Sequence, residues 1–229
     1  MSRPQPAGGT PEAGSIESLY PFLYAGQTDV SAVLDQVRES TVAKAQEVIE
    51  LRRAVCAADG TRLADCARAM AGRFRAGGRL LAFGNGGSAT DAQQLVTTFL
   101  QPGPGALPLP ALGLASDSSV LTALANDIGV DVIFARQIAA FGGKSDIAVG
   151  LSTSGNSDNL LRAFDEASRR GLLTIGIAGY QGGKMAELEA LDYLFVAPSS
   201  SVHRIQEAQT TMYHVLWELC QAEVQRGSP

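Results

Sequence analysis

The turn Gly84-Asn85-Gly86-Gly87-Ser88 follows the apolar run Leu80-Leu81-Ala82-Phe83, and the turn Ser152-Thr153-Ser154-Gly155-Asn156-Ser157 follows Ile147-Ala148-Val149-Gly150-Leu151. Both runs are short and apolar throughout, which is typical of parallel strands buried on both faces. Each turn opens a helix-like run, whose first N–H groups and partial positive charge attract anions. Glycine lets the backbone approach an anion closely, and Ser and Thr hydroxyls donate further hydrogen bonds. Since neither turn contains Lys or Arg, we predict two loops that hold a phosphomonoester through neutral donors.

Other classes of nucleotide or cofactor loop fit these turns less well. Gly84 to Ala89 matches the dinucleotide fingerprint G-x-G-x-x-A, which expects an acidic residue about 20 positions further on. The nearest acid at a strand end is Asp117, well beyond that spacing. Neither turn ends in Gly-Lys-Ser or Gly-Lys-Thr, which excludes a P-loop. An ordinary strand-to-helix turn also favours Gly, Ser and Asn, but the four hydroxyls of the second turn argue against it.

Composition limits the domain size, the classes of partner and the cellular location that the sequence predicts. Its 229 residues suit one well-cored domain with appendages. The net charge of −5 predicts no direct binding of nucleic acid or of an anionic membrane. We see no apolar run long enough for a membrane helix and no signal peptide. Three widely spaced cysteines, Cys56, Cys66 and Cys220, form no disulfide framework and no zinc motif, so we predict a reducing, cytoplasmic location.

The amino-terminal part differs in composition from the rest. Residues 1–14 contain Pro, Gly and Ser with few apolar residues, which predicts a disordered tail. An extension follows over residues 15–33, and we assign the main domain to residues 34–229. Within the extension, large apolar groups crowd a short stretch: Leu19, Tyr20, Phe22, Leu23 and Tyr24. Such groups seek a partner surface, so we predict that residues 15–27 associate with a neighbouring subunit or a protein partner. The alternative is a segment that folds back on its own chain.

Apolar periodicity predicts an α/β fold. Two amino-terminal helices are expected over residues 28–58 and 61–74, the second closed by Gly77-Gly78. Five apolar strands are expected over residues 79–83, 110–114, 146–151, 172–178 and 192–196. Helices are expected over residues 88–100, 117–125, 131–141, 157–170, 183–189 and 200–226. This alternation specifies a parallel sheet covered by helices on both faces.

Five motifs in one order carry a family resemblance. They are Gly-Asn-Gly-Gly-Ser, Ala-Asn126-Asp127, Leu-Ser-Thr-Ser-Gly-Asn-Ser, Gly-Gly-Lys-Met, and Arg204-Ile205-Gln206-Glu207. The sequence resembles the sugar isomerase (SIS) domain proteins, and among them the phosphoheptose isomerases and their non-catalytic relatives that bind the bacterial replication initiator. The resemblance implies a flavodoxin-like five-stranded parallel sheet, phosphosugar binding and a homotetramer that shares its sites. It assigns the phosphate or the sugar to Asn85, Ser88, Asp127, Ser152, Thr153, Ser154 and Ser157.

The chain departs from that family at the positions that bind the metal and move the proton. Phosphoheptose isomerases carry a metal-binding His and Glu, four residues apart, on the helix after Gly-Asn-Gly-Gly-Ser, and the Glu also moves the proton. Here those positions are Gln94 and Thr98. A glutamine is a poor zinc ligand compared with histidine, and a threonine hydroxyl is no base near pH 7. The family's partners on the last helix are retained as Gln206 and His214, whereas its Asp before Arg-Ile-Gln is replaced by His203.

These departures lead to one prediction and two alternatives. We predict no bound cofactor, because only Gln206, His203 and His214 remain as weak candidate ligands for zinc. The predicted function is binding of a sugar phosphate, a ketose phosphate such as sedoheptulose 7-phosphate. One alternative is an active aldose–ketose isomerase that uses His214 and Gln206 with a non-standard partner. The other is a phosphosugar-responsive scaffold or regulator, and a dinucleotide-binding oxidoreductase remains as a third class that a ribose-binding acid after strand 110–114 would reveal.

Overall fold

The computed structural model describes residues 30–226. The predicted tail over residues 1–14 and the predicted association segment over residues 15–27 lie outside the described residues. The described chain divides into two units between Ala45 and Gln46, and each is taken by itself. In the first unit, residues 31–45 are all exposed, among them the apolar Val33, Leu34, Val37 and Val42.

Helix α3 runs without a break over Val30–Arg75. The prediction of two helices separated near Asp59 and Gly60 was therefore wrong. A glycine inside a helix costs only about 1 kcal/mol relative to alanine. Past Gly60 the helix keeps burying one face, in which Leu63, Met70 and Phe74 pack into the core. Burial of such side chains is worth about 1.5–3 kcal/mol each, which outweighs the local propensity for a break.

The sheet has five parallel strands in the order β2-β1-β3-β4-β5. The strands are β1 (Leu80–Gly84), β2 (Ala111–Gly113), β3 (Ile147–Ser152), β4 (Leu173–Gly179) and β5 (Tyr193–Ala197). Every residue of β1, β3 and β4 is buried, as their apolar sequences predict. Strand β2 is a three-residue edge strand and is only partly buried. The α/β class and the flavodoxin-like strand order are those predicted.

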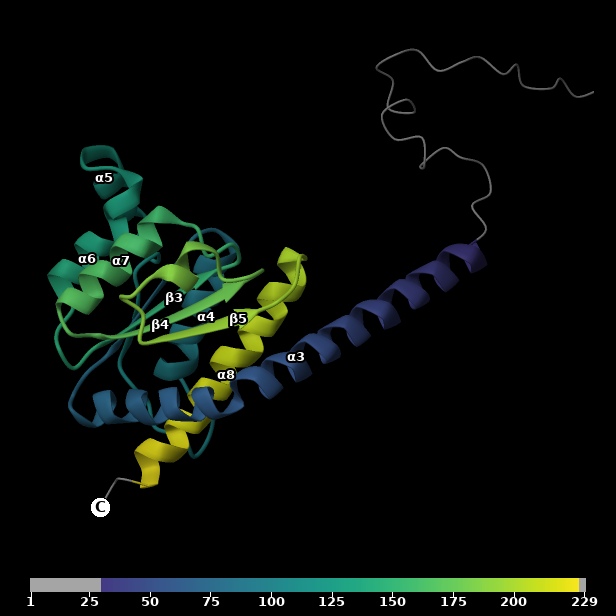
Figure 1. Ribbon diagram of the computed structural model, residues 1–229, viewed down its shortest axis with the longest axis horizontal. Helices are drawn as coiled ribbons and strands as arrows, with labels where there is room; N and C mark the ends of the chain where they lie inside the picture. The colour runs from purple at the N-terminus through teal and green to yellow at the C-terminus, as the bar shows by residue number, and fades with distance from the viewer. Residues whose placement is uncertain (1–29, 227–229) are drawn as a thin grey trace, which may run out of the picture. The chain divides into compact units, whose positions relative to one another are not determined.

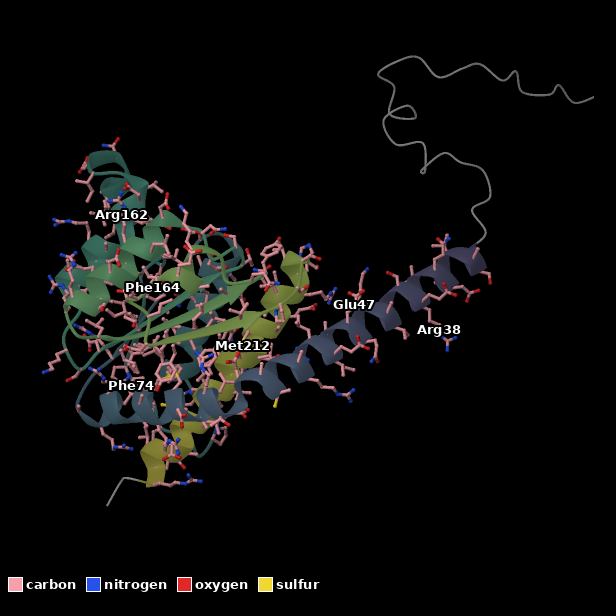
Figure 2. The ribbon with its side chains drawn as sticks, in the orientation of Figure 1. Arg38, Glu47, Phe74, Arg162, Phe164 and Met212 are labelled. Carbon is pink, nitrogen blue, oxygen red and sulfur yellow. The ribbon has the colours of Figure 1, made fainter. Side chains whose placement is uncertain are left out.

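Helices cover both faces of this sheet (Figure 1). Alternate strand residues point to opposite faces, so Leu80 and Ala82 join one core cluster and Leu81 and Phe83 join the other. The first cluster lies under α3, α4 (Gly87–Leu100) and α8 (Val202–Arg226). The second lies under α6 (Ile133–Phe141) and α7 (Asp158–Arg169). Figure 2 shows Phe164 between α7 and the strands, and Met212 on α8.

Short elements complete the chain. Helix α5 (Ser118–Asp127) and the 3-10 turn η1 (Val130–Val132) precede α6, and the 3-10 turn η2 (Gly183–Glu187) lies between β4 and β5. Asp117 caps α5, because its carboxylate accepts hydrogen bonds from the N–H groups of Ser119 and Val120. Within residues 30–226, no helix is both long enough and apolar enough to cross a membrane.

Candidate functional site

Two loops meet at the carboxyl ends of the neighbouring strands β1 and β3. Parallel pairing aligns Gly84 with Leu151, so the loops 85–88 and 152–157 start side by side. From β1 the chain crosses to β2 on one side and later to β3 on the other, which makes this the topological switch point of the sheet. Helices α4 and α7 begin where these loops end. Their first N–H groups lack partners within the helix and carry partial positive charge, so the switch point suits an anion.

A reciprocal amide pair joins the two halves of the site. The side-chain amide of Asn85 donates to Asn159 Oδ1 over 2.9 Å, and that of Asn159 donates to Asn85 Oδ1 over 3.0 Å. Asn159 is buried in the first turn of α7. Asn85 was predicted to contact the ligand, whereas its side chain is used here to hold the first loop against α7. The pair thus fixes the separation of the two helix N-termini.

The hydroxyls of the second loop keep their protons available. Ser152 Oγ accepts the N–H of Gly155 over 3.0 Å, and Ser154 Oγ accepts the N–H of Asn156 over 3.2 Å. In each bond the hydroxyl is the acceptor, so its own O–H remains free to donate elsewhere. Ser157 stands at the N-cap of α7 without capping it through its side chain. Several neutral donors are therefore gathered at one helix N-terminus.

The second loop packs tightly on the turn after β4. Gly155 has φ +68°, and a Cβ at this position would lie 1.9 Å from the carbonyl oxygen of Gly182. Asn156 Oδ1 accepts the N–H of Lys184 over 2.9 Å, and the N–H of Met185 donates to Gly155 O over 3.0 Å. These contacts give the loop one defined shape. The Gly-Gly-Lys-Met motif is therefore the turn on which the loop 152–157 packs.

Helix α8 lies against α4 beside the first loop. Gln206 Nε2 is 3.4 Å from Asp91 Oδ2, and the same nitrogen would lie 2.4 Å from a Cβ on Gly87. Burial raises the pKa of Asp91 above its ordinary value, although the hydrogen bond from Gln206 acts in the opposite direction. Asp91 is the one ionisable residue in α4, and the sequence interpretation did not single it out. It lies one turn after Ser88 and three residues before Gln94, on the same side of the helix.

The other residues predicted for the site make no described hydrogen bond to the two loops. Thr98 donates its hydroxyl to Gln94 O in its own helix, and Gln94 is exposed. His214 is half-buried, with its ring centroid 5.0 Å from that of Tyr213, while His203 is exposed in the first turn of α8. Asp127 is exposed at the end of α5 and accepts a hydrogen bond from the neighbouring Asn126. Because that bond stays within α5 and does not reach the two loops, the place of Asp127 near the sugar stays a prediction.

The side chains do not fit the zinc site that the family resemblance implies. Among residues 30–226, no group of three or more His, Cys, Asp or Glu side chains is arranged to hold a metal ion. Gln206 is turned towards Asp91, and Thr98 uses its hydroxyl within α4. Burial raises the pKa of the Cys66 thiol and raises that of Cys220 to about 12, so neither readily becomes a thiolate ligand. No chemical step is therefore assigned to a metal here.

A cavity of about 440 Å³ opens beside the first turn of α4. It is lined by Ala89, Thr90, Gln93, Ala115 and Ser116. The loop after β2 and the start of α4 both contribute, so the cavity lies next to the first phosphate-type loop. Ser116 donates to Gln93 Oε1, which leaves the amide nitrogen of Gln93 as a further donor. The cavity offers hydroxyl and amide groups to a polar ligand that extends from the switch point.

Two kinds of comparison relate this chain to known proteins. The SIS domain family matches residues 45–179. The chain is 40% identical over 183 residues to the phosphoheptose isomerase of Aquifex aeolicus, covering 78% of this chain and 93% of that protein. It is 45% identical over 168 residues to the phosphoheptose isomerase of Solidesulfovibrio magneticus, covering 70% of this chain and 78% of that protein.

Solved structures agree with these sequence matches. The phosphoheptose isomerase of Neisseria gonorrhoeae superposes with a TM-score of 0.75 at 32% identity, covering 81% of this chain and 99% of that one. The Francisella tularensis enzyme superposes with a TM-score of 0.73 at 32% identity, covering 83% and 98%. More distant is the Vibrio vulnificus NanR protein complexed with ManNAc-6P, at a TM-score of 0.57, 14% identity, and coverage of 86% and 70%. At that identity the likeness concerns the fold alone.

Proposed function

Because the chain belongs to the SIS domain family, we propose that it binds a sugar phosphate at the switch point between β1 and β3. The observation that carries the proposal is the pair of loops 85–88 and 152–157, joined by Asn85 and Asn159 and placed at two helix N-termini. In this arrangement the hydroxyls of Ser88, Ser152, Thr153, Ser154 and Ser157 and the first N–H groups of α4 and α7 hold the phosphate. The absence of Lys and Arg from both loops suits a phosphomonoester bound by neutral donors.

The proposed ligand is a ketose phosphate such as sedoheptulose 7-phosphate. Support comes from the phosphoheptose isomerases that the chain resembles along most of its length. Further support comes from the cavity beside α4, whose Thr90, Gln93 and Ser116 can form hydrogen bonds with sugar hydroxyls. A thermal-shift screen against a panel of sugar phosphates tests the proposal. A ligand at 100 times its dissociation constant adds about 2.7 kcal/mol of stability, and a panel in which no sugar phosphate shifts the midpoint would refute it.

Replacing Ser154 with alanine is expected to weaken binding of the sugar phosphate by about 1.5–3 kcal/mol, the range for hydrogen bonds to charged groups. The substitution removes one donor and also the acceptor for the N–H of Asn156. Isothermal titration calorimetry measures the effect. Ser168→Ala, at an exposed position of α7, is the matched control and should leave the affinity unchanged. Equal affinities for both variants would show that Ser154 does not contact the ligand.

A second candidate function is aldose–ketose isomerisation, and Asp91 is the observation that favours it. Isomerisation needs a base that takes a proton from one carbon and returns it to the next. Thr98 cannot serve, whereas Asp91 is a half-buried carboxylate on the same side of α4 and beside Gln206. Burial raises its pKa and so makes it a stronger base. In this version of the function His214 and Gln206 act on the sugar oxygens.

If the protein is an isomerase, Asp91→Asn is expected to lower the turnover of sedoheptulose 7-phosphate by about a hundredfold, the lower bound for losing a general base. Binding of the sugar phosphate should persist, since the phosphate loops are intact. Incorporation of solvent deuterium next to the carbonyl group reports the proton transfer directly. Asp165→Asn, on the exposed face of α7, is the neutral control. Unchanged deuterium incorporation in Asp91→Asn would remove Asp91 from the mechanism.

The purified protein is expected to hold well below one zinc ion per chain, since only Gln206 and His214 of the family's ligands are retained and His203 is the one further candidate on the last helix. Elemental analysis after dialysis against a mild chelator measures the content. One tightly held zinc per chain would show that these residues rebuild a metal site, and would favour a metal-assisted isomerase over the binding protein.

Assembly and partners extend the same proposal. We propose a cytoplasmic homotetramer, as the family resemblance implies, with residues 15–27 as a contact for a neighbouring subunit or a protein partner. That contact is the basis of the scaffold alternative, in which the sugar phosphate regulates association instead of being converted. Deletion of residues 1–27 distinguishes this association role from a segment that folds back on its own chain. Only association predicts that the truncated protein stays folded but changes its oligomeric mass in light scattering or loses a partner in a pull-down.

A further inference from the structure

A glutamine lies within the apolar face of the last helix. The side chain of Gln209 is fully buried, at 0% exposure, between turns of α8 that bury Ile205, Met212 and Tyr213. At this position the helical spacing calls for an apolar residue. A polar side chain here has a cost of burial that its hydrogen bonds have to offset.

The amide of Gln209 is committed to the carboxyl ends of two strands. Its Nε2 donates to Ser152 O and to Ile177 O, each over 3.1 Å. Ser152 is the last residue of β3 and the first of the second phosphate-type loop, and Ile177 lies in β4. One side chain of α8 therefore joins the two strands at the point where the loop leaves the sheet. Since both nearby acceptors are carbonyl oxygens, the nitrogen and not the oxygen must face them.

The oxygen of the same amide, Gln209 Oε1, is buried and makes no hydrogen bond within the described residues. A buried acceptor without a partner is unfavourable, and a buried polar group of this kind calls for a reason. An apolar side chain of equal size would fill the space without that penalty. The two donated bonds are thus the reason for the amide.

The loop depends on Ser152 for its shape. Ser152 Oγ accepts the N–H of Gly155, which is the residue whose positive φ turns the loop towards Gly182. A displaced Ser152 main chain would carry its hydroxyl away from Gly155 and open the loop. We propose that Gln209 is a positioning residue that fixes the 152–157 loop in its anion-binding shape. The proposal rests on the proposed function, because it takes that loop as the phosphate site.

The same helix offers a matched control. Gln221 is also buried in α8, where its Nε2 donates to Leu107 O over 2.8 Å and its Oε1 accepts the N–H of Leu107 over 3.0 Å. Leu107 belongs to the connection before β2, away from the loop 152–157 in the chain. Gln209→Met and Gln221→Met remove the same amide from the same helix. A purely structural role predicts equal consequences for both.

The experiment compares the affinity for inorganic phosphate and for sedoheptulose 7-phosphate by calorimetry in the wild type and in the two variants. Gln209→Met is expected to bind both about tenfold more weakly, a difference of about 1.4 kcal/mol, whereas Gln221→Met stays within about twofold. Amide hydrogen exchange adds a readout on the loop itself. The N–H of Gly155 should exchange faster in Gln209→Met than in the wild type. Its exchange rate in Gln221→Met should equal that of the wild type.

The outcomes separate the two claims. Normal phosphate affinity and normal Gly155 exchange in Gln209→Met would overturn the positioning role and leave phosphosugar binding intact. A wild-type protein that binds neither ligand would overturn the proposed function and the positioning role with it. Should Gln209→Met not fold, Gln209→Asn keeps the amide on a shorter stem and is expected to show the same two losses to a smaller degree. Normal values in that variant would also overturn the role.

Discussion

Replacing Gly155 with alanine is expected to lower the free energy of unfolding by about 2–5 kcal/mol and to abolish binding of sugar phosphates. Two costs add up at this residue. A non-glycine residue at φ +68° is disfavoured by about 1–2 kcal/mol. Overpacking costs about 1–3 kcal/mol more, because the new Cβ would lie 1.9 Å from Gly182 O, a main-chain atom that cannot rotate away. Urea denaturation measures the stability, and calorimetry measures the binding.

The control for Gly155→Ala is Gly77→Ala. Gly77 has φ +79°, but a Cβ there would meet no atom within 4 Å. This variant should therefore show only the backbone part, about 1–2 kcal/mol, with normal ligand affinity. Equal losses of stability in the two variants would show that the contact with Gly182 is not what constrains the loop. Normal affinity in Gly155→Ala would remove the loop shape from the account of binding.

Replacing Phe164 with alanine is expected to destabilise the protein by about 3–5 kcal/mol. The ring is fully buried, and its centroid lies 5.2 Å from that of Phe83, a residue of β1. It also occupies the space beside Gly150, where a Cβ would lie 2.5 Å from the ring. Phe141→Ala is the matched control, since Phe141 is exposed and should change stability by less than about 0.5 kcal/mol.

A double substitution tests the cause of the Phe164 effect. Gly150→Ala alone should destabilise, because the added methyl group strikes the ring of Phe164. In the Phe164→Ala background the same change should cost clearly less, because that ring has gone, although Phe83 remains close. Strictly additive losses in denaturant unfolding would contradict direct packing of the ring on Gly150.

The sequence predicted most of the fold because the deciding signals are local. Each of the five strands was expected within about a residue of its observed limits, since each is an apolar run closed by a turn. The break expected near Gly60 failed because the burial of Leu63, Met70 and Phe74 overrides the local propensity of one glycine. That burial depends on a surface made by distant parts of the chain.

In the candidate site too, local features could be predicted from the sequence and contacts between distant residues could not. The two loops could be predicted, because glycines and hydroxyls follow apolar runs directly. The contacts that hold these loops could not be predicted, because they join residues far apart in the sequence. They span 74 residues from Asn85 to Asn159, 115 from Asp91 to Gln206, and 57 from Ser152 to Gln209. A signal for Gln209 did exist in the sequence. It is a polar residue in the apolar stripe of α8, and such a mismatch in the helical pattern is typical of a buried side chain that makes hydrogen bonds.

The three-residue strand β2 has a consequence for how copies of the protein meet. An exposed sheet edge is a template for another chain to add a strand, which leads to domain swapping and fibrils. Here that edge is very short and follows Pro108 and Pro110, neither of which has an N–H to donate. The main chain of β2 therefore offers little to an incoming strand. At this edge of the sheet, contacts between copies at high concentration are therefore expected to form through side chains and not by addition of a strand from another copy.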